Sequence, residues 1–380
     1  MKAKNIVFQD LLKCLSREKF NAIVERYEGD KWSKQYTSWD LFITLLQGQL
    51  VGDRSLRTVV LTHQCQEAYL KQLSAKYMPR STLSDACKVR KPEIWADVFN
   101  HIVSQLQGRY KKIIKDVRDF IHLIDSTSII LKGRGYEWTQ DSCRIKGLKA
   151  HVVYDKELES PIYLTMTDAN VNDITEAKKL SLKKGATYVF DKGYFDYSWW
   201  NELHLNECRF VTRIKKNAPF KRLKRQEVKG EAIQHDWIIK ISSRRGREFK
   251  DPLRHIRVKI STGKTIEIVS NDLKSSAEEI AELYKRRWDI ELFFKCIKQN
   301  LKIKQFWSKS ENGVKLQIIT AMIAYLLLRI AQFSTRTTQS IQKIRIMICL
   351  KLYERTTLYR ILKDAGKGKN QLLKAGASYD

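Results

Sequence analysis

FIHLIDSTSIIL, residues 120–131, is the stretch at which the sequence changes from a helical pattern to a strand pattern. Its apolar and β-branched residues run almost without interruption, as in a strand buried on both faces of a sheet. Asp125 is the one carboxylate in this run. A carboxylate among apolar neighbours must be paired, hydrogen-bonded or bound to a metal ion, because an isolated buried charge is too costly. The structural alternative is that Asp125 accepts hydrogen bonds from the Ser-Thr turn after it.

Further apolar runs follow this segment. They predict strands at residues 150–155, 161–168, 186–191 and 209–214, with a helix at 173–184 between the second and third. Strands of this length with an intervening helix indicate an α/β or α+β core.

A second carboxylate repeats the pattern of the first. The run TYVFD is apolar up to Asp191, so two aspartates interrupt or end two strands of one predicted sheet. Carboxylate oxygens are the ligands that Mg²⁺ prefers, with the remaining positions left to water and substrate phosphate. Asp168, Asp173 and Asp196 compete for this role, but each lies in a looser, turn-like context.

The regions on either side of these strands have different patterns. Residues 1 to about 115 have apolar residues at helical spacing, and residues 311–380 are expected to be mostly helical. Between about 213 and 272, short alternating stretches rich in Lys and Arg predict antiparallel strands separated by glycine turns. A long helix is predicted over residues 275–301 after this β-rich insertion.

Residues 52–60 and 80–106 predict basic helices within the N-terminal region. Thr82 and Asp85 fit a capping box, and Pro92 suits the first turn of the next helix. A basic helical pair is compatible with a helix-turn-helix that reads a major groove. The alternative is an ordinary helical domain with a basic surface.

The composition indicates a partner of opposite charge. The 380 residues carry a formal net charge of +29, and nucleic acid is the commonest polyanion. The seven cysteines form no Cys-x-x-Cys pair, which excludes a zinc knuckle and suits a reducing cytosol. The N-terminus lacks the pattern of a signal peptide. The apolar stretch at 318–330 is shorter than a bilayer span, so a buried helix and a cytoplasmic protein are expected.

Residues 284–300, YKRRWDIELFFKCIKQN, place several functional groups at helical spacing. On an ideal helix Tyr284, Arg287, Glu291 and Lys298 fall within a sector of roughly 60°. An apolar stripe runs beside them, composed of Leu283, Ile290, Phe294, Ile297 and Leu301. The pattern predicts Glu291 along the edge of a buried face, as in an active-site wall. A solvated face with incidental charge pairs is the alternative.

The spacing Tyr-x2-Arg-x3-Glu-x6-Lys resembles the YREK signature of DDE transposases of the insertion-sequence "IS-four" type. Asp125 in a first strand and Asp191 in the sequence DKGY resemble the two other acidic motifs of that family. The resemblance covers residues 120–310 and extends more loosely to the N-terminal helices. It implies a ribonuclease-H-like core over 118–310 interrupted by the insertion, a DNA-binding helical domain over 1–117, and a helical C-terminal region over 311–380.

The resemblance also implies a mechanism. Asp125, Asp191 and Glu291 would bind two Mg²⁺ ions, with Mn²⁺ expected to substitute, for in-line displacement at phosphorus. Tyr284, Arg287 and Lys298 would hold the phosphates of the transposon ends. The expected partners are the inverted repeats of the element, target DNA and a second copy of the chain. The apolar content of the C-terminal helices, and not the resemblance, motivates the hypothesis that two copies pair through them. The reaction would be cut-and-paste transposition at the bacterial nucleoid.

Several details and alternatives remain open at this point. A hairpin intermediate would need an aromatic side chain to receive a flipped base, but Trp237 and Trp288 are expected to pack in the core. The basic stretches at 215–225 and 242–250 are a candidate DNA track, or solvated loops. The chain as a whole could instead be another ribonuclease-H-like nuclease, or an inactive or regulatory relative that only binds element ends.

Overall fold

The computed structural model describes residues 5–113, 120–139, 146–228, 231–243, 246, 249–260, 262–301 and 305–363. These residues form two compact units. The first unit contains the described residues up to Ile113, those from Ile130 to Thr139, and those from Lys295 onward. The second unit contains the remaining described residues up to Phe294.

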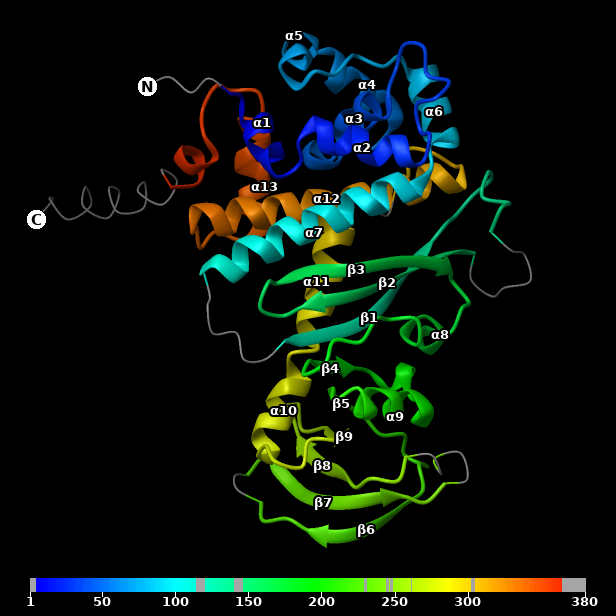
Figure 1. The fold of residues 1–380 in the computed structure, drawn as a ribbon, viewed down its shortest axis with the longest axis vertical. Coiled ribbons are helices and arrows are strands. Elements are labelled where there is room, and N and C mark those ends of the chain that lie inside the picture. The colour runs from blue at the N-terminus through cyan, green and yellow to red at the C-terminus, as the bar shows by residue number, and fades with distance from the viewer. Residues whose placement is uncertain are drawn as a thin grey trace, which may run out of the picture. The chain divides into compact units, whose positions relative to one another are not determined.

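The first unit is helical, and its N-terminal and C-terminal segments share one core (Figure 1). Helix α12 packs along α7 and also contacts α3, α6 and α13. The elements are α1 (Val7–Leu11), η1 (Leu12–Cys14), α2 (Arg17–Arg26), α3 (Ser38–Val51), α4 (Leu56–Gln64), α5 (Glu67–Leu70), η2 (Lys71–Leu73), α6 (Arg80–Val89), α7 (Pro92–Ile113), α12 (Glu311–Thr335) and α13 (Ile341–Leu350).

Helix α12 contains the apolar stretch for which the sequence predicts a buried helix. Within the described part of the chain it is the one helix long and apolar enough to cross a membrane. However, 89% of its most apolar 18-residue window is buried inside the protein. The prediction of a buried helix is therefore confirmed, because the apolar side chains face neighbouring helices of the same unit.

Local signals fix several helix ends. Thr37 caps the start of α3 through a capping box with Asp40. The helix ends before Gly52, whose φ of +82° favours glycine. Helix α7 begins at Pro92 as predicted. The capping box predicted at Thr82 and Asp85 is wrong, because α6 already begins after Pro79 and both residues lie inside it. Proline fixes its own φ and lacks an N–H, which suits the start of a helix.

His63 of α4 is a buried polar residue that ties α4 to α3. Its Nδ1 lies 2.6 Å from Gln47 Oε1, and its Nε2 lies 3.2 Å from Thr44 Oγ1. Burial lowers the pKa of His63 to about 4. The neutral imidazole is therefore the form that the folded unit accommodates.

This shift predicts a loss of stability in acid. The unfolded chain binds a proton at His63 near its usual pKa of about 6.5, whereas the folded chain does so only near 4, so stability falls as the pH drops through this window. The full contribution is about 3 kcal/mol. The melting temperature of His63→Gln should therefore fall less between pH 7 and 4.5 than that of the unsubstituted protein. An equal fall in the melting temperature of both proteins over this pH range would contradict the prediction.

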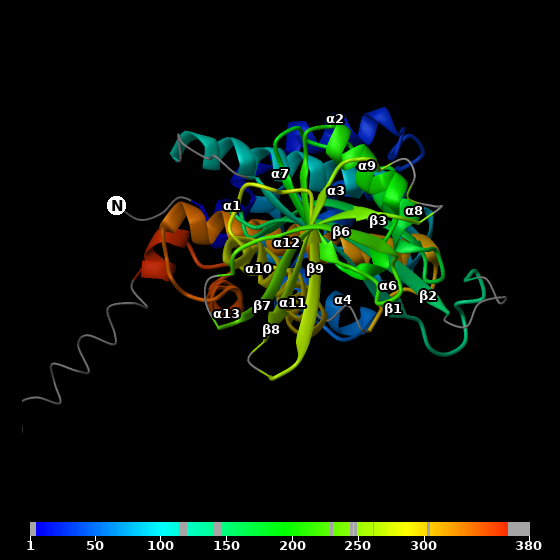
Figure 2. The same ribbon diagram turned by 90° about the horizontal axis from the view of Figure 1, so that it is seen from below.

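The second unit is built on one sheet. Its described strands have the order β3-β2-β1-β4-β5-β9-β8-β7-β6 in a nine-stranded sheet. Figure 2 shows the strands fanned about a common centre, as in a strongly twisted sheet. The strands are β1 (Ile121–Ile130), β2 (Gly147–Asp155), β3 (Ser160–Asp168), β4 (Thr187–Phe190), β5 (Arg209–Arg213), β6 (Phe220–Arg225), β7 (Ile233–Ile241), β8 (Leu253–Lys259) and β9 (Thr265–Ser270).

The chain between these strands forms α8 (Asp173–Ala177), η3 (Lys192–Tyr194) and α9 (Tyr197–Leu205), followed after β9 by α10 (Ala277–Lys285) and α11 (Trp288–Asn300). Trp199 and Trp200 of α9 are buried against Phe190 and Phe210 of the sheet. The predicted helix at 173–184 is shorter in the structure, where it ends at Ala177.

The strands predicted between about 213 and 272 continue the sheet. Strand β9 pairs antiparallel with β5, and β8, β7 and β6 follow outward. The loop interpretation of residues 215–225 is wrong for Phe220–Arg225, which form the edge strand β6. From Lys221 onward this strand is exposed on both faces, so its sequence lacks the alternation that marks a half-buried strand. Charged edge strands of this kind resist unwanted pairing with other chains.

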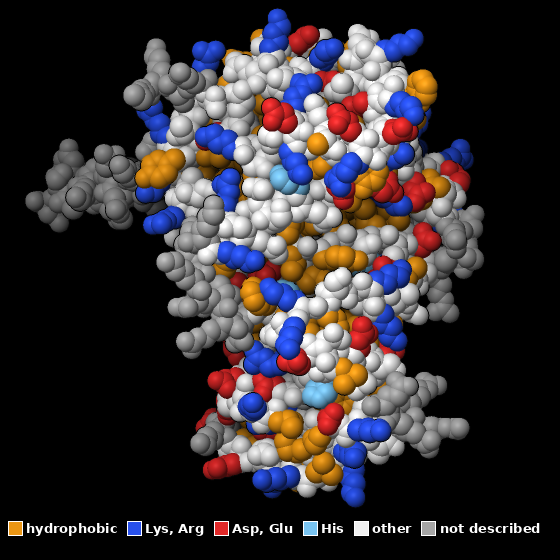
Figure 3. All heavy atoms as spheres, viewed as in Figure 1, with side chains coloured by type: hydrophobic (Ala, Val, Ile, Leu, Met, Phe, Trp, Pro, Cys, Tyr) orange, Lys and Arg blue, Asp and Glu red, His pale blue; other side chains and the backbone are white. Residues whose placement is uncertain are grey.

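The surface shows how the positive charge is distributed. Lys and Arg side chains are scattered over the visible face, interspersed with acidic groups (Figure 3). The excess of cations is thus spread widely over this face and does not by itself mark a binding surface.

Candidate active site

The register of two parallel strands brings the predicted aspartates together. β1 pairs with β4 so that Ile124 lies opposite Phe190. Asp125 follows Ile124 on β1, and Asp191 follows Phe190 directly after β4, so the two aspartates are neighbours at the end of β4. The apolar residues of β1 and β4 up to this point are buried. The sheet thus presents both carboxylates from a rigid core.

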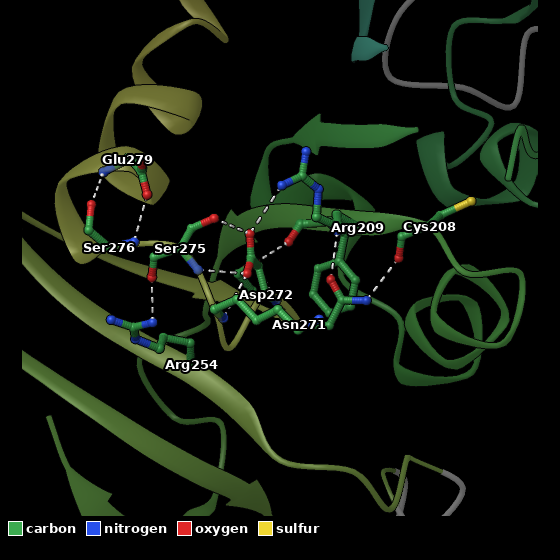
Figure 4. Close-up of polar contacts among 11 residues, drawn as sticks. Cys208, Arg209, Arg254, Asn271, Asp272, Ser275, Ser276 and Glu279 are labelled. Carbon is green, nitrogen blue, oxygen red and sulfur yellow. Dashed lines mark hydrogen bonds and ion pairs between the residues drawn. The ribbon is translucent and has the colours of Figure 1, made fainter. Parts of the chain in front are cut away.

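A hydrogen-bonded turn connects β9 to α10, the helix that leads to the remaining site residues (Figure 4). Asp272 accepts hydrogen bonds from the Lys274 and Ser275 backbone N–H groups, at 2.9 and 3.0 Å. The Ser275 hydroxyl also donates to Asp272, at 2.6 Å. Ser276 then caps α10 in a capping box with Glu279. This turn fixes where α10 leaves the sheet.

Tyr284, in the last turn of α10, reaches the second aspartate. Its hydroxyl donates to Asp191 Oδ1 at 3.4 Å. The side chain is buried, and this burial raises the pKa of Tyr284 to about 12. The phenol is therefore protonated at neutral pH and acts as a hydrogen-bond donor.

The prediction of one long helix over residues 275–301 is wrong at one point. The structure has two helices, α10 and α11, joined at Arg286 and Arg287. There the Arg287 N–H donates to Tyr284 O and the Asp289 N–H donates to Arg286 O, which are three-residue spacings in place of four. The sequence on both sides keeps its helical pattern, so periodicity does not reveal the break. Tertiary contacts of Arg287 accompany it.

Arg287 joins two of the predicted carboxylates. Its Nη2 lies 2.6 Å from Glu291 Oε1, and its Nη1 lies 3.7 Å from Asp125 Oδ2. The guanidinium is only 12% exposed, so these ion pairs are poorly screened. Tyr284 on α10, Arg287 in the turn and Glu291 on α11 thus converge on the two aspartates.

The environment of Asp125 disfavours its charged form. Burial raises the pKa of Asp125 to about 6, and the charges of Glu291 and Asp191 act in the same direction. The Ser126 backbone N–H, which donates to Asp125 Oδ1 at 2.8 Å, and the Arg287 guanidinium act against this rise. Three carboxylates therefore share one partly buried site where their mutual repulsion is only partly offset.

Lys298, the last residue of the predicted stripe, lies on α11 two helical turns beyond Glu291. It belongs to the first compact unit. The apolar stripe predicted beside it is confirmed at Ile290, Phe294, Ile297 and Leu301, which are buried.

Comparison with known proteins identifies the family. The model of the transposase DDE domain matches residues 121–327, and that of a domain of unknown function, DUF4372, matches residues 3–76. The chain is 39% identical over 284 residues to a protein of Sinorhizobium fredii named as transposase y4zB, covering 73% of this chain and 79% of that protein. The chain belongs to the DDE transposase family. This membership confirms the resemblance to transposases of the insertion-sequence "IS-four" type.

More distant relatives of this DDE transposase carry similar names. A Geobacillus stearothermophilus protein named as the transposase of the element IS5377 is 28% identical, with 66% of each chain covered. A Synechocystis protein named for the element IS4SA is 23% identical, with 72% and 78% covered. A solved piggyBac transposase in a synaptic complex with hairpin DNA matches with a TM-score of 0.49 at 12% identity, over 96% of this chain and 85% of that chain. A likeness that weak determines no mechanism.

The family as a whole depends on divalent metal ions, so the donor set of this transposase has to suit them. Among the residues that the structure describes, no three His, Cys, Asp or Glu side chains are already arranged to hold an ion. The chemistry nevertheless fits, because Asp125, Asp191 and Glu291 offer the oxygen ligands that Mg²⁺ prefers. Arg287 now supplies the positive charge between Glu291 and Asp125. A bound cation would replace that charge and relieve the repulsion among the carboxylates.

Two aromatic predictions for the transposase have different outcomes. Trp237 is partly buried and packs against the core of the sheet, with the guanidinium groups of Arg222 and Arg225 over its ring at 5.3 and 5.9 Å. The prediction that Trp288 packs in the core is wrong, because its side chain is 60% exposed at the start of α11. Trp288 follows Arg287 directly, and the turn between the helices directs the indole outward.

The competing aspartates have separate surroundings. Asp196 caps α9 by accepting from the Trp199 N–H at 2.9 Å, a structural role. Asp168 ends β3. The turn-like context of Asp173 argues against a role near Asp125, yet its carboxylate accepts a hydrogen bond from Ser126, the residue after Asp125. Its place as the first residue of α8, directly after the Asn172 N-cap, is visible in the sequence, but its contact with β1 is not.

Proposed function

We propose that this transposase cleaves DNA at the ends of its element and joins those ends to target DNA, using two divalent ions held by Asp125, Asp191 and Glu291. The observation that carries the proposal is the convergence of these carboxylates: β1 and β4 set the two aspartates side by side, and Arg287 links Glu291 to Asp125. Bound Mg²⁺ supplies an activated oxygen nucleophile and stabilises the leaving oxygen of an in-line displacement.

The basic groups would then act on the DNA backbone, while the phenol of Tyr284 holds a carboxylate of the site. Once a cation neutralises the carboxylates, the Arg287 guanidinium is free to form the forked contact with a phosphate that suits its geometry. Tyr284 holds the Asp191 carboxylate through its protonated hydroxyl and orients it. Lys298 would add a point charge for a phosphate further along the same helix.

The wider architecture supports the same reaction. The order β3-β2-β1-β4-β5, with β1, β4 and β5 parallel, is typical of a ribonuclease-H-like core. We assign this core to residues 118–310, DNA binding by helices to 1–117, and pairing of two copies to 311–380. The substrates would be double-stranded inverted repeats and target DNA, at the bacterial nucleoid.

The test uses purified protein and labelled DNA that ends in the repeats flanking its own gene. In Mg²⁺ or Mn²⁺ we expect cleavage at the repeat boundary, and none in EDTA. Pre-cut ends should be joined to plasmid DNA under the same conditions. Cleavage of any DNA without joining would indicate a nuclease of the same fold. Binding of the ends without cleavage in either metal would indicate a regulatory relative. Either of these two outcomes overturns the proposal.

A further inference from the structure

We propose that Asp173 is a positioning residue for Asp125 and acts through Ser126. The inference rests on the proposed function, because it concerns how the first metal-binding carboxylate is oriented. Asp173 itself would touch neither metal nor DNA. Its role would be to fix the residue that holds the carboxylate of Asp125.

Ser126 contacts both aspartates. Its backbone N–H donates to Asp125 Oδ1 at 2.8 Å, and its hydroxyl donates to Asp173 Oδ1 at 2.7 Å. A serine hydroxyl has one proton to donate, so the bond to Asp173 selects one rotamer of the side chain. The Ser126 N–H in turn holds one of the two carboxylate oxygens of Asp125. Asp173 thereby restrains the residue that orients Asp125.

Asp173 is itself held from several sides. Lys149 Nζ lies 3.0 Å from Asp173 Oδ1 and also donates to Val171 O at 2.7 Å. On the other side, a Cβ at Gly193 would lie 3.6 Å from Asp173 Oδ2. Gly193 belongs to η3, the turn directly after Asp191. Asp173 is therefore packed between the strand that carries one catalytic aspartate and the turn that follows the other.

The pleat of β1 places Asp173 behind the site. Successive side chains of a strand point to opposite faces of the sheet, so Asp125 and Ser126 face opposite ways. Asp173, which Ser126 contacts, thus approaches from the face opposite to that of the Asp125 carboxylate. This geometry separates Asp173 from the donor set and makes it a support. Supporting residues of this kind typically change metal affinity or activity about 10–100-fold when they are removed.

The test measures metal binding directly, by titrating the protein with Mn²⁺ and following the free ion by electron paramagnetic resonance. We expect Asp173→Ala and Ser126→Ala each to weaken Mn²⁺ binding by about 10-fold or more. Ser126→Thr keeps a hydroxyl on the strand and should restore binding to within a few-fold. Asp168→Ala removes a carboxylate at the end of β3 without touching the Ser126–Asp173 hydrogen bond, and should bind Mn²⁺ normally. Melting curves without metal identify any variant that has simply lost its fold.

The double variant separates this pathway from a general charge effect. If Asp173 acts through Ser126, then Asp173→Ala should weaken binding far less in the Ser126→Ala background than in the unsubstituted protein. Equal losses in both backgrounds, or normal Mn²⁺ binding by a folded Asp173→Ala variant, would overturn the inference and leave the proposed function standing. Failure of the unsubstituted protein to bind Mn²⁺ would count against the proposed function itself.

Discussion

Glu291→Gln and Asp125→Asn should each reduce cleavage at the element ends by on the order of 10³-fold or more. In the proposed mechanism, each change removes a charged ligand of a metal ion that would stabilise the transition state by several kcal/mol. About 1.4 kcal/mol corresponds to a factor of ten in rate. DNA binding should persist, because glutamine and asparagine keep the shape of the side chain and a carbonyl that can accept a hydrogen bond from Arg287. Single-turnover cleavage and fluorescence anisotropy on the same labelled DNA measure the two quantities.

The matched control is Asp289→Asn. Asp289 lies on the same helix as Glu291 and pairs with Lys156 at 2.7 Å, away from the carboxylate cluster. The change alters the net charge by the same amount as Glu291→Gln, so a general electrostatic effect on DNA binding would appear in both. We expect Asp289→Asn to cleave within a few-fold of the unsubstituted protein. Substantial cleavage by either Glu291→Gln or Asp125→Asn would show that the wrong carboxylates have been assigned.

The strand context of the two aspartates could be predicted from the sequence because the signal is local. Each lies within or at the end of a short, β-branched apolar run that favours a buried strand, and the structure has β1 and β4 there. The register that makes Asp125 and Asp191 neighbours cannot be predicted in this way. It depends on pairing between distant segments, which one-dimensional periodicity does not encode.

The stripe on residues 284–298 shows where periodicity fails. An ideal helix would place Tyr284 on a polar face, whereas the structure buries it and turns its hydroxyl to Asp191. The cause is the break at Arg286 and Arg287, which interrupts the regular helical hydrogen bonding between α10 and α11. Arg287 contacts Asp125 on another element, and such tertiary contacts can outweigh local helix propensity.

The sequence predicts that antiparallel strands follow β5, but it does not predict how they pair with the core sheet. Alternating stretches predicted β7, β8 and β9, yet nothing local indicates that β9 joins β5 and extends the core sheet. Strand β6 was missed because an edge strand with solvent on both faces has no apolar side to reveal it. The contact of Asp173 could not be predicted for a related reason, since its partner Ser126 lies on another element.

Disrupting a buried ion pair within these strands should have a large effect on the stability of this part of the sheet. Asp236 of β7 is fully buried, and Arg254 of β8 binds it through Nε at 2.7 Å to Oδ1 and Nη2 at 2.5 Å to Oδ2. Arg254 Nη1 also donates to Ser275 O at 2.7 Å, in the turn that leads to α10 (Figure 4). The pair thus connects the outer strands of the sheet to the helix that delivers Tyr284.

Asp236→Ala should destabilise this region by about 3–5 kcal/mol, because it leaves the Arg254 charge buried without its counter-ion. Hydrogen exchange of β7 and β8 should then accelerate by roughly two to three and a half orders of magnitude, as measured by mass spectrometry on their peptides. Replacing both partners, with Asp236→Leu and Arg254→Met, should cost less than Asp236→Ala alone, since no unpaired charge remains. If the double variant is the less stable one, the pair is a net source of stability and this account of it is wrong.

Arg257→Met serves as the matched control on the same strand. Arg257 binds Glu267 at 2.5 Å, but its side chain is 43% exposed, so solvent screens the pair. Exposed ion pairs of this kind contribute about 0–1 kcal/mol. We therefore expect Arg257→Met to change exchange by less than about 10-fold. Arg254 reaches the turn before α10, so DNA cleavage should fall in Asp236→Ala but not in Arg257→Met. This difference would link the stability of the outer strands to the placement of Tyr284.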